Sequence, residues 1–455
     1  MIKKIKEKSI KKIKEKSRKG KTSFQIIIGS FFALIMLGTL LLMLPISSQS
    51  RTVTPFADCM FTAVSATCVT GLIVRDTATY WSLFGKCVII TLIQIGGMGV
   101  ITIGLAIMRA SGRKIGFAQR STMQESISAP QVGGIVKFTG FILKTSAIIE
   151  LTGAALLAPV FIKDFGVVKG IGYSLFHSIS AFCNAGFDLM GVREPFSSLT
   201  TYSSHAYLNI VIMLLIIVGG IGFMTWHDIG THKLRFIKYS LQSKVVIFTS
   251  LLLILLPAVY FFLYEYSDLG IKERLLSSAF QSVTARTAGF NSQDLAEMNE
   301  SGTLIMIVLM LIGGSPGSTA GGMKTATFAV LFLTAITVFS RRNDVQVFKR
   351  RVPEDAVRNA GAILFMYLVL FVTGGMVISR TEDLPLLTCL FETGSAIGTA
   401  GLTLGITTSL SMLSKLILMF LMFFGRVGGL TLIYAAVSSA ESSKVKMPLE
   451  KISVG

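Results

Sequence analysis

Long apolar runs and short, more polar segments alternate along the chain, four times over. The long runs occupy residues 24–44, 83–108, 137–162, 206–226, 244–264, 304–339, 361–379 and 413–437. A helix needs about 20 mainly apolar residues to cross a membrane, so each run predicts one transmembrane helix. The pattern therefore predicts an all-α integral membrane protein with eight transmembrane helices.

One related short segment lies between the two long runs of each unit. The four segments are FTAVSATCVTGL (61–72), FHSISAFCNAGF (176–187), FQSVTARTAGF (280–290) and FETGSAIGTAGL (391–402). Each runs from Phe, through Ser or Thr followed by Ala, to Gly and a large apolar residue, and the third is one residue shorter. A single glycine of this kind is usually a helix C-cap, but the fourfold recurrence favours a shared functional role.

From Pro55 or Phe56 to Cys68 there is room for a helix of about a dozen residues, which is too short to cross a hydrocarbon core of about 30 Å, and the related segments are interpreted in the same way. The segment is therefore expected to enter the membrane and return to the same side. Non-helical backbone at this depth must be buried in protein or line a watery cavity. The return strands are thus expected to face an interior passage.

The return strands predict a selectivity filter for a cation. Glycine enters left-handed backbone geometry without steric cost, inward-facing carbonyl oxygens can replace the water shell of an ion, and helix C-termini carry roughly half a negative charge. The predicted filter residues are Val69, Thr70, Gly71, Asn184, Ala185, Gly186, Thr287, Ala288, Gly289, Thr399, Ala400 and Gly401.

Two crossings and one dip return each unit to the side where it began, so all four units share one orientation and can surround one axis. The predicted fold is four pseudo-symmetric helix–pore loop–helix repeats, with eight transmembrane helices and four re-entrant pore helices around a central ion pore. The expected parts are a basic cytoplasmic N-terminal tail (1–22), repeat 1 (23–110), repeat 2 (130–230), repeat 3 (243–341), repeat 4 (355–440) and a cytoplasmic C-terminal tail (441–455).

Glycines also recur in the second long run of each unit, as QIGGMG (94–99), VGGIGF (218–223) and GRVGGL (425–430), which predicts close helix packing. The third copy, IGGSPGSTAGGMK (312–324), combines glycines with Pro316 and predicts a helix break inside the membrane. Such a break must line a cavity. A phosphate-binding loop is excluded because Met323 separates Gly322 from Lys324.

We expect the broken segment and one arginine of the fourth unit to form a gate below the filter. A charge near the bilayer centre costs about 2.5 to 3.5 kcal/mol on insertion scales, so it usually serves a purpose. The predicted gate residues are Gly313, Gly314, Ser315, Pro316, Gly317, Ser318, Thr319, Ala320, Gly321, Gly322, Lys324 and Arg426.

Composition agrees with a membrane protein, since 52% of the residues are hydrophobic and 15% are charged. The net charge of +19 is compatible with binding to nucleic acid. However, basic residues gather in a repeated N-terminal octapeptide (2–17) and in the alternate loops 109–120, 232–244 and 341–351, as in cytoplasmic segments. We therefore expect no nucleic acid, both termini in the cytoplasm, a multi-pass plasma-membrane location and membrane lipid as a partner, with anionic-lipid attachment by the tail as the alternative.

The residues needed for catalysis or metal binding are sparse. The chain has four histidines, no HExxH motif and no nucleophile with a nearby base, which gives little for acid–base chemistry. Its five cysteines, Cys59, Cys68, Cys87, Cys183 and Cys389, show no CxxC pair and are expected to be small packing residues. The sequence argues against an enzyme, against a cofactor and against any bound metal other than the transported ion.

The four loops, with VTGL, NAGF, TAGF and TAGL at their ends, resemble the pore segments of the Trk/Ktr/HKT superfamily of potassium transporters. The length and helix number are most similar to the membrane subunit of bacterial Ktr-type potassium uptake systems. The resemblance implies K+ in the filter, because superfamily members with Ser in place of the first filter glycine tend toward sodium, and this chain has Gly71.

The same resemblance implies a gate beneath the filter, in which the arginine at the position of Arg426 repels cations until the gate moves. It further implies a homodimer on a cytosolic ring of nucleotide-binding regulatory subunits, with the C-terminal KISVG in the dimer interface and the loops from Arg109, Arg235 and Arg341 as docking surfaces. Sodium-stimulated K+ uptake is expected. A sodium-coupled secondary potassium transporter and a sodium-permeable member of the same superfamily stay open.

Several residues carry weaker or alternative hypotheses. Arg426 has the alternative of reaching the membrane surface or pairing with Glu150, which itself has Lys144 as another candidate partner. Arg286 is expected to brace the filter by donating to backbone carbonyls. His177 is expected to be a packed, hydrogen-bonded residue rather than a ligand.

Overall fold

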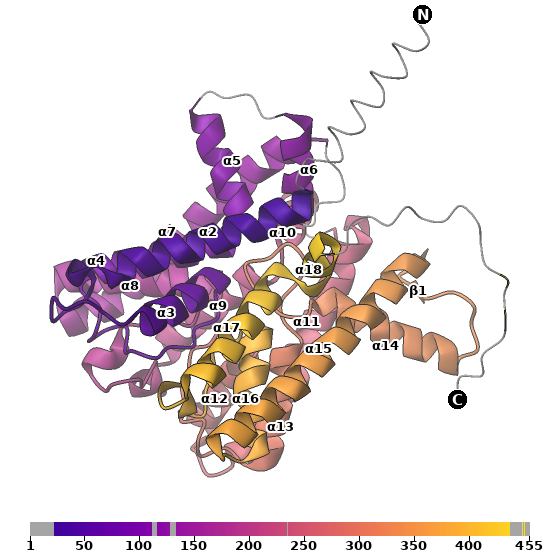
Figure 1. Cartoon of the computed structure of the whole chain (residues 1–455). Helices are drawn as coiled ribbons and strands as arrows, with labels where there is room; N and C mark the ends of the chain where they lie inside the picture. The colour runs from indigo at the N-terminus through magenta and orange to yellow at the C-terminus, as the bar shows by residue number, and fades with distance from the viewer. Residues whose placement is uncertain are drawn as a thin grey trace, which may run out of the picture.

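The computed structural model describes residues 22–111, 116–127, 133–233 and 235–436, together with Pro448 and Glu450. Nearly all of the expected N-terminal tail (1–22) and most of the C-terminal tail (441–455) lie outside the described residues, as does KISVG. The described chain is a body of helices from which α5 and α6 project (Figure 1).

The helices follow one another in an order of long, short and broken elements. The first part of the chain contains α2 (Ser23–Met43), α3 (Phe56–Cys68), α4 (Leu83–Met98), α5 (Val100–Ala110) and α6 (Phe117–Ser126). The second contains α7 (Ile135–Phe165), α8 (Val167–Cys183), α9 (Ala206–Gly220) and α10 (Phe223–His232). The third contains α11 (Leu241–Tyr260), a π-helical extension (Phe261–Glu265), α12 (Ile271–Thr284), α13 (Glu300–Leu311), α14 (Thr325–Phe339) and a hairpin of β1 (Gln346–Val347) and β2 (Arg350–Arg351). The last contains α15 (Glu354–Glu382), α16 (Leu386–Gly398), α17 (Met412–Val427) and α18 (Gly429–Ala436).

Several of these helices are long and apolar enough to cross a membrane. Within the described residues, α2, α7, α11 with its π-helical extension, and α15 meet this condition, and the pairs α4–α5, α9–α10 and α17–α18 meet it when each pair is taken together. Their length and composition are those of membrane-spanning helices.

The second long element of the first, second and fourth units is not the continuous helix that the sequence analysis expected. Bends of 94°, 96° and 92° separate α4 from α5, α9 from α10 and α17 from α18. A glycine with positive φ lies at each bend, namely Gly99 (87°), Gly222 (97°) and Gly428 (90°). A right-handed helix cannot continue through such a residue, so the helix ends and restarts in a new direction.

The expected close packing occurs at a different glycine of the same motifs. A Cβ atom added to Gly96, Gly219 or Gly425 would collide with the carbonyl oxygen of Thr67, Phe182 or Ile397, respectively. Each of these oxygens belongs to the last turn of a short helix. The glycines therefore allow α4, α9 and α17 to lie against the ends of α3, α8 and α16.

Polar residues start the helix that follows each short helix. The side chains of Ser82, His205, Asn299 and Ser411 accept hydrogen bonds from the first turns of α4, α9, α13 and α17. These N-caps satisfy backbone donors that would otherwise have no partner at the helix start.

The later turns of the short helices lie in the interior of the body, whereas their first residues, such as Val168 and Ile271, are exposed. α3 packs against α2 and α4, α8 against α7 and α9, α12 against α11 and α9, and α16 against α15 and α17. Cys59, Cys68, Cys183 and Cys389 are buried and free, as expected for packing residues, whereas Cys87 is exposed on α4. The core thus lies where the short helices end.

Candidate functional site

The four short helices end in loops of closely related backbone geometry. α3, α8 and α16 each end at a residue in the left-handed conformation, with φ of 58° at Val69, 58° at Asn184 and 51° at Thr399. In the third loop, which is one residue shorter, the left-handed residue is Thr287 with φ of 69°. Each loop therefore turns at the residue two positions before its glycine.

The four predicted filter glycines also have positive φ, with values of 99° at Gly71, 68° at Gly186, 80° at Gly289 and 82° at Gly401. A side chain at any of these positions would be strained, whatever space surrounds it. The glycine in each segment is thus required by the backbone itself.

Each of these glycines lies against the next loop in chain order. A Cβ atom on Gly71 would lie 2.5 Å from the Ala185 oxygen, and one on Gly186 would lie 2.9 Å from the Ala288 oxygen. A Cβ atom on Gly289 would lie 2.7 Å from the Ala400 oxygen.

The series then returns to its start. A Cβ atom on Gly401 would collide with the Thr70 oxygen and approach the Gly71 Cα atom. The four glycines therefore close a ring, although more than 300 residues separate the first from the last. All twelve predicted filter residues are brought together in this ring of loops, and all are buried.

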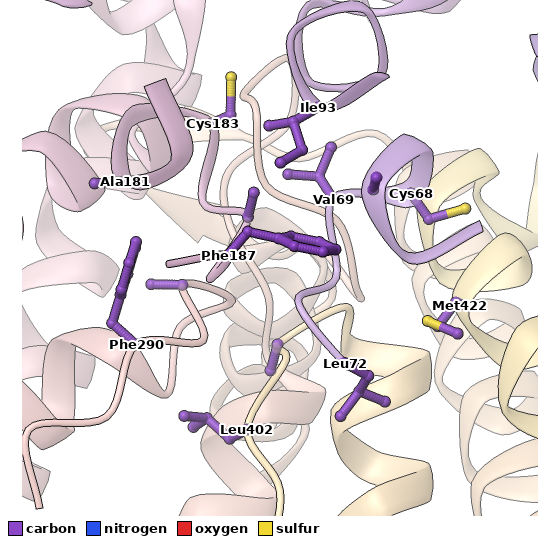
Figure 2. Packing of buried hydrophobic residues seen from close by; sticks show 14 of the residues in the cluster. Cys68, Val69, Leu72, Ile93, Ala181, Cys183, Phe187, Phe290, Leu402 and Met422 are labelled. Atoms are coloured by element: carbon purple, nitrogen blue, oxygen red, sulfur yellow. The ribbon is translucent and has the colours of Figure 1, made fainter. Parts of the chain in front are cut away.

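Large apolar residues follow the ring glycines and pack around the loops. Leu72, Phe187, Phe290 and Leu402 are each at most 1% exposed. Figure 2 shows them on the converging loops, with Cys68 and Met422 on neighbouring helices. This apolar packing fixes loops that lack regular secondary structure.

A hydroxyl group at one shared position of the short helices ties several loops to their helices. Ser65 accepts from the Gly71 N–H, whereas Ser180 and Thr284 donate to the Phe187 and Phe290 oxygens. These residues belong to the Ser/Thr–Ala pair of the repeated segment. The pair therefore has a structural purpose, because it holds the loop beside the glycine.

The residue after the first Phe gives a second support in the second and fourth segments, which sequence reasoning did not assign. His177 Nε2 accepts from the Leu189 N–H at 3.3 Å, and Glu392 Oε1 accepts from the Leu404 N–H at 3.2 Å. Leu189 and Leu404 occupy the same position, three residues after a ring glycine. His177 Nδ1 lies 2.8 Å from the Tyr173 oxygen, so His177 is packed and hydrogen-bonded as expected.

Glu392 is fully buried and makes further contacts with the same return strand. Its carboxylate accepts from the hydroxyls of Thr403 and Thr407 as well as from the Leu404 N–H. The signal for this role was present in the sequence, because a polar residue follows the first Phe in all four segments: Thr62, His177, Gln281 and Glu392.

The predicted helix break lies between α13 and α14, from Ile312 to Lys324, and we call residues 313–324 the gate segment. Its backbone bonds to neighbouring broken helices, with Ser315 N–H donating to Gly220 O at 3.0 Å and Gly322 N–H donating to Gly425 O at 3.2 Å. The Thr319 hydroxyl donates to Phe182 O at the end of α8, at 3.0 Å. The gate segment thus lies directly beside the loop ring.

The contact with the fourth loop is especially close. A Cβ atom on Gly321 would collide with the Thr399 side chain, and one on Gly322 would lie 2.8 Å from Gly398 O. Small residues in the gate segment therefore allow it to approach the end of α16.

The guanidinium of Arg426 joins the gate segment to α4. It donates to the carbonyl oxygens of Thr319, Gly96 and Gly97, the last at 2.9 Å. Glu150 instead accepts from the Gln94 side-chain amide, at 2.8 and 3.1 Å. The alternatives of pairing between Arg426 and Glu150, and of Arg426 reaching the membrane surface, are therefore wrong.

Two other cationic side chains lie near the gate segment. Lys324 Nζ donates to Ala320 O at 2.7 Å and to Gly321 O at 3.4 Å, within the segment itself. Arg286 donates to the hydroxyls of Ser250 and Thr325. The expectation that Arg286 donates to filter carbonyls is wrong, because its side chain reaches the start of α14 instead.

A cavity of about 200 Å³ lies against the gate segment. Its lining includes Gly317, Ser318, Lys324, Arg426 and the Ser126–Ile127 corner after α6. The loop ring, the gate segment and this cavity are neighbours. The fold and site define a helical integral membrane protein in which the loops after four short helices converge.

Comparison with known proteins assigns the family. A family model described as TrkH, cation transport protein, matches residues 2–446. The chain is 39% identical to the potassium/sodium uptake protein NtpJ of Enterococcus hirae, covering 96% of this chain and 98% of that protein. It is 37% identical to the Ktr system potassium uptake protein B of Bacillus subtilis (strain 168), covering 95% and 96%, respectively.

A solved structure also matches. The potassium transporter TrkH from Vibrio parahaemolyticus superposes with a TM-score of 0.73, at 19% identity, over 92% of this chain and 85% of that chain. The chain belongs to the TrkH family of cation transport proteins, and its fold is that of TrkH. It is a multi-pass membrane transport protein and not an enzyme.

Proposed function

We propose that this protein takes up K+ through a gated pore whose selectivity filter is the ring of four glycine-ended loops. The closed ring from Gly71 through Gly186 and Gly289 to Gly401 carries this proposal, because it gathers four equivalent backbone turns at one place. Carbonyl oxygens arranged in rings replace the hydration shell of a permeating cation. Relatives named as potassium uptake proteins support K+ as that cation.

The architecture behind this proposal is fourfold. Four helix–pore loop–helix repeats, with eight transmembrane spans and four re-entrant pore helices, account for the order of long, short and broken helices. The span that completes the eight is the pair α13 and α14, which the gate segment interrupts. α3, α8 and α16 end at the ring, so their partial negative charges favour a cation there.

The gate segment and Arg426 block the passage on one side of the filter in this arrangement. The side chain of Arg426 bridges Thr319 to Gly97, which holds the segment next to the filter ring and places a positive charge there. Movement of the segment would open a route into the adjacent cavity of about 200 Å³. This side is cytoplasmic in our proposal, since the basic loops lie after α5, α10 and α14.

We infer regulation by a partner, and the names of relatives support this inference. Relatives from Bacillus subtilis (strain 168) and Vibrio alginolyticus are each named Ktr system potassium uptake protein B, that is, as one protein of a system. We infer a homodimer bound to a cytosolic ring of nucleotide-binding subunits, with sodium stimulating uptake. The loops from Arg109, Arg235 and Arg341 are the proposed docking surfaces.

A sodium-permeable transporter is the second candidate function. The relative from Enterococcus hirae, at 39% identity, is named a potassium/sodium uptake protein. Sodium-coupled potassium transport is the related alternative, in which both ions move together.

Flux into liposomes separates these functions. Purified protein is reconstituted, and K+ and Na+ uptake are measured separately and in competition, each with and without the other ion. The proposal expects K+ entry that a large excess of Na+ does not displace. Equal entry of both ions favours the second candidate, strict dependence of K+ entry on Na+ entry favours coupling, and no entry of either ion contradicts all three.

A further inference from the structure

Arg286 lies between a pore helix and a filter loop, but its side chain extends toward the gate segment. It follows the end of α12 by two residues and precedes Thr287, the left-handed residue of the third loop. In the described part of the chain its side-chain partners are two hydroxyl groups, with Nη2 at 3.2 Å from Ser250 Oγ and 3.1 Å from Thr325 Oγ1.

Thr325 continues this connection into the gate segment. Its hydroxyl donates to Gly313 O at 2.9 Å, and its backbone N–H donates to Gly314 O at 3.0 Å. Arginine can only donate, so the Thr325 oxygen accepts from Arg286 and its proton goes to Gly313. The direction of the chain of hydrogen bonds is thereby fixed from Arg286 through Thr325 to Gly313.

The same place joins a second filter loop to the gate segment. Arg286, Asn184 and Gly314 line a small cavity between α9, α11 and α12. Asn184 is the left-handed residue of the second loop. The second loop, the third loop and the gate segment therefore meet around this arginine.

The arginine occurs in the repeat that has the long gate segment. Three residues before the ring glycine, the other repeats have the small residues Cys68, Cys183 and Gly398, whereas the third has Arg286. Those other repeats replace the gate segment by a single bend at Gly99, Gly222 or Gly428. The cationic side chain and the gate segment are thus paired features of one repeat.

We propose that Arg286 is a positioning residue that couples the third filter loop to the gate segment through Thr325. This inference rests on the proposed function of the ring as an ion filter. When the gate segment moves at Gly313, the hydrogen-bonded Thr325 and Arg286 carry the movement to Thr287. The filter then changes its geometry when the gate opens, although Arg286 does not contact the ion.

The test is a comparison of substitutions in two backgrounds. Arg286→Gln, Arg286→Lys, Thr325→Val and Thr325→Ser are made in the full chain and in a chain that lacks residues 317–322 of the gate segment. Arg274→Gln on the same pore helix is the matched control, since Arg274 donates instead to backbone oxygens including that of Leu263. K+ uptake and the K+ over Na+ preference are measured in liposomes.

In the full chain, Arg286→Gln and Thr325→Val are expected to change K+ uptake on the order of tenfold, as for loss of hydrogen bonds involving a charged group. They are also expected to lower the K+ over Na+ preference, and Thr325→Ser should restore it because the hydroxyl remains. In the chain with the shortened segment the same substitutions should have much smaller effects. Equal fold-changes in both backgrounds would overturn the coupling, as would Thr325→Val behaving like the unmodified protein.

Folding is checked by melting temperature and by size-exclusion chromatography in mild detergent. If Arg286→Gln does not fold, the Thr325→Val and Thr325→Ser pair decides the question, because neither changes a charge. Failure of the coupling is distinct from failure of the proposed function. In the first case the unmodified protein still transports K+ selectively, and in the second it does not.

Discussion

The Arg426 guanidinium donates to the carbonyl oxygen of Gly97 at 2.9 Å and so joins the last broken helix to the first. Sequence alignment of the glycine motifs places Arg426 at the same position as Gly97, Gly220 and Gly314. One repeat thus contributes a cation where the other three contribute a glycine. Arg426 lines the cavity beside the gate segment.

Replacement of Arg426 by Gln is expected to raise K+ flux in the absence of any regulatory partner. The substitution removes a positive charge that repels cations and weakens the bonds to Thr319 and Gly97. We expect an increase on the order of tenfold, comparable to the loss of a hydrogen bond to a charged group. Flux of purified protein in liposomes measures the effect.

Lys415→Gln is the matched control, since Lys415 is a cation near the opposite end of α17. It should leave the basal flux unchanged. A decrease or no change on replacing Arg426, in folded protein, would contradict its role as a barrier.

Replacement of Glu392 by Gln is expected to loosen the fourth return strand. The carboxylate accepts from the Leu404 N–H and from two threonine hydroxyls, and hydrogen bonds to charged groups contribute about 1.5 to 3 kcal/mol. We expect a lower melting temperature together with a weaker K+ over Na+ preference. Thermal unfolding in detergent and competition uptake measure the two effects.

Glu382→Gln distinguishes support of the filter from general stability. Glu382 also accepts from a backbone N–H and from hydroxyls, but at Ser411 and Ser414 at the start of α17. It should lower the melting temperature without changing ion preference. If both variants alter the preference equally, the bond to Leu404 has no special relation to the filter.

The carboxyl group of Asp188 predicts a pH dependence of uptake. Asp188 lies two residues after Gly186, and burial raises its pKa from 3.8 to about 7, with the nearby Asp76 adding to the rise and the Met190 N–H opposing it. Above this pKa the carboxylate attracts cations beside the filter, and below it the charge is lost. The K+ concentration for half-maximal uptake should therefore increase as the external pH falls through about 7.

Asp188→Asn should remove that pH dependence, and an unchanged pH profile in this variant would count against the assignment.

Asp188 affects folding stability in the opposite direction, because a rise in pH favours cation attraction but lowers stability. Its pKa is higher in the folded state than its ordinary value of 3.8, so the folded state binds more protons between 3.8 and about 7. This group therefore lowers the free energy of unfolding as the pH rises through that range.

The filter loops were predictable because their pattern is local and repeated. Ser or Thr, Ala and Gly recur at fixed spacing in each segment, and each has a backbone or hydrogen-bonding reason that acts within about ten residues. The break at residues 313–324 was predictable for the same reason, because glycines and Pro316 disfavour a helix wherever they lie.

The bends at Gly99, Gly222 and Gly428 were not predictable from the same kind of pattern. Isolated glycines near a helix end are compatible with close packing or with positive φ, and tertiary contacts decide between them. In these motifs the two uses fall on different glycines, with packing at Gly96 and the bend at Gly99.

The partners of buried charges were also beyond sequence reasoning. Arg426 binds oxygens about 330 residues away, and those acceptors are backbone atoms that every residue has. Complementary charge suggested Glu150 as the partner of Arg426, but in the structure the side-chain amide of Gln94 donates to the Glu150 carboxylate. Hydrogen bonds to backbone leave no signature in residue identity, so the acceptors of Arg426 were not predictable. Arg286 was assigned backbone carbonyls, but its acceptors are hydroxyl groups 36 and 39 residues away, which only the tertiary structure brings to it.

Competition between K+ and Na+ uptake by Gly401→Ser tests the central claim most directly. Gly401 has a φ of 82°, and a Cβ atom added there would collide with the Thr70 oxygen. The ring must therefore distort to accept a serine. Gly405→Ala is the matched control, since Gly405 has a φ of 92° with open space around it. We predict that Gly401→Ser loses most of its preference for K+ while Gly405→Ala keeps it. An unchanged K+ preference in folded Gly401→Ser protein would contradict the ring of glycines as the selectivity filter.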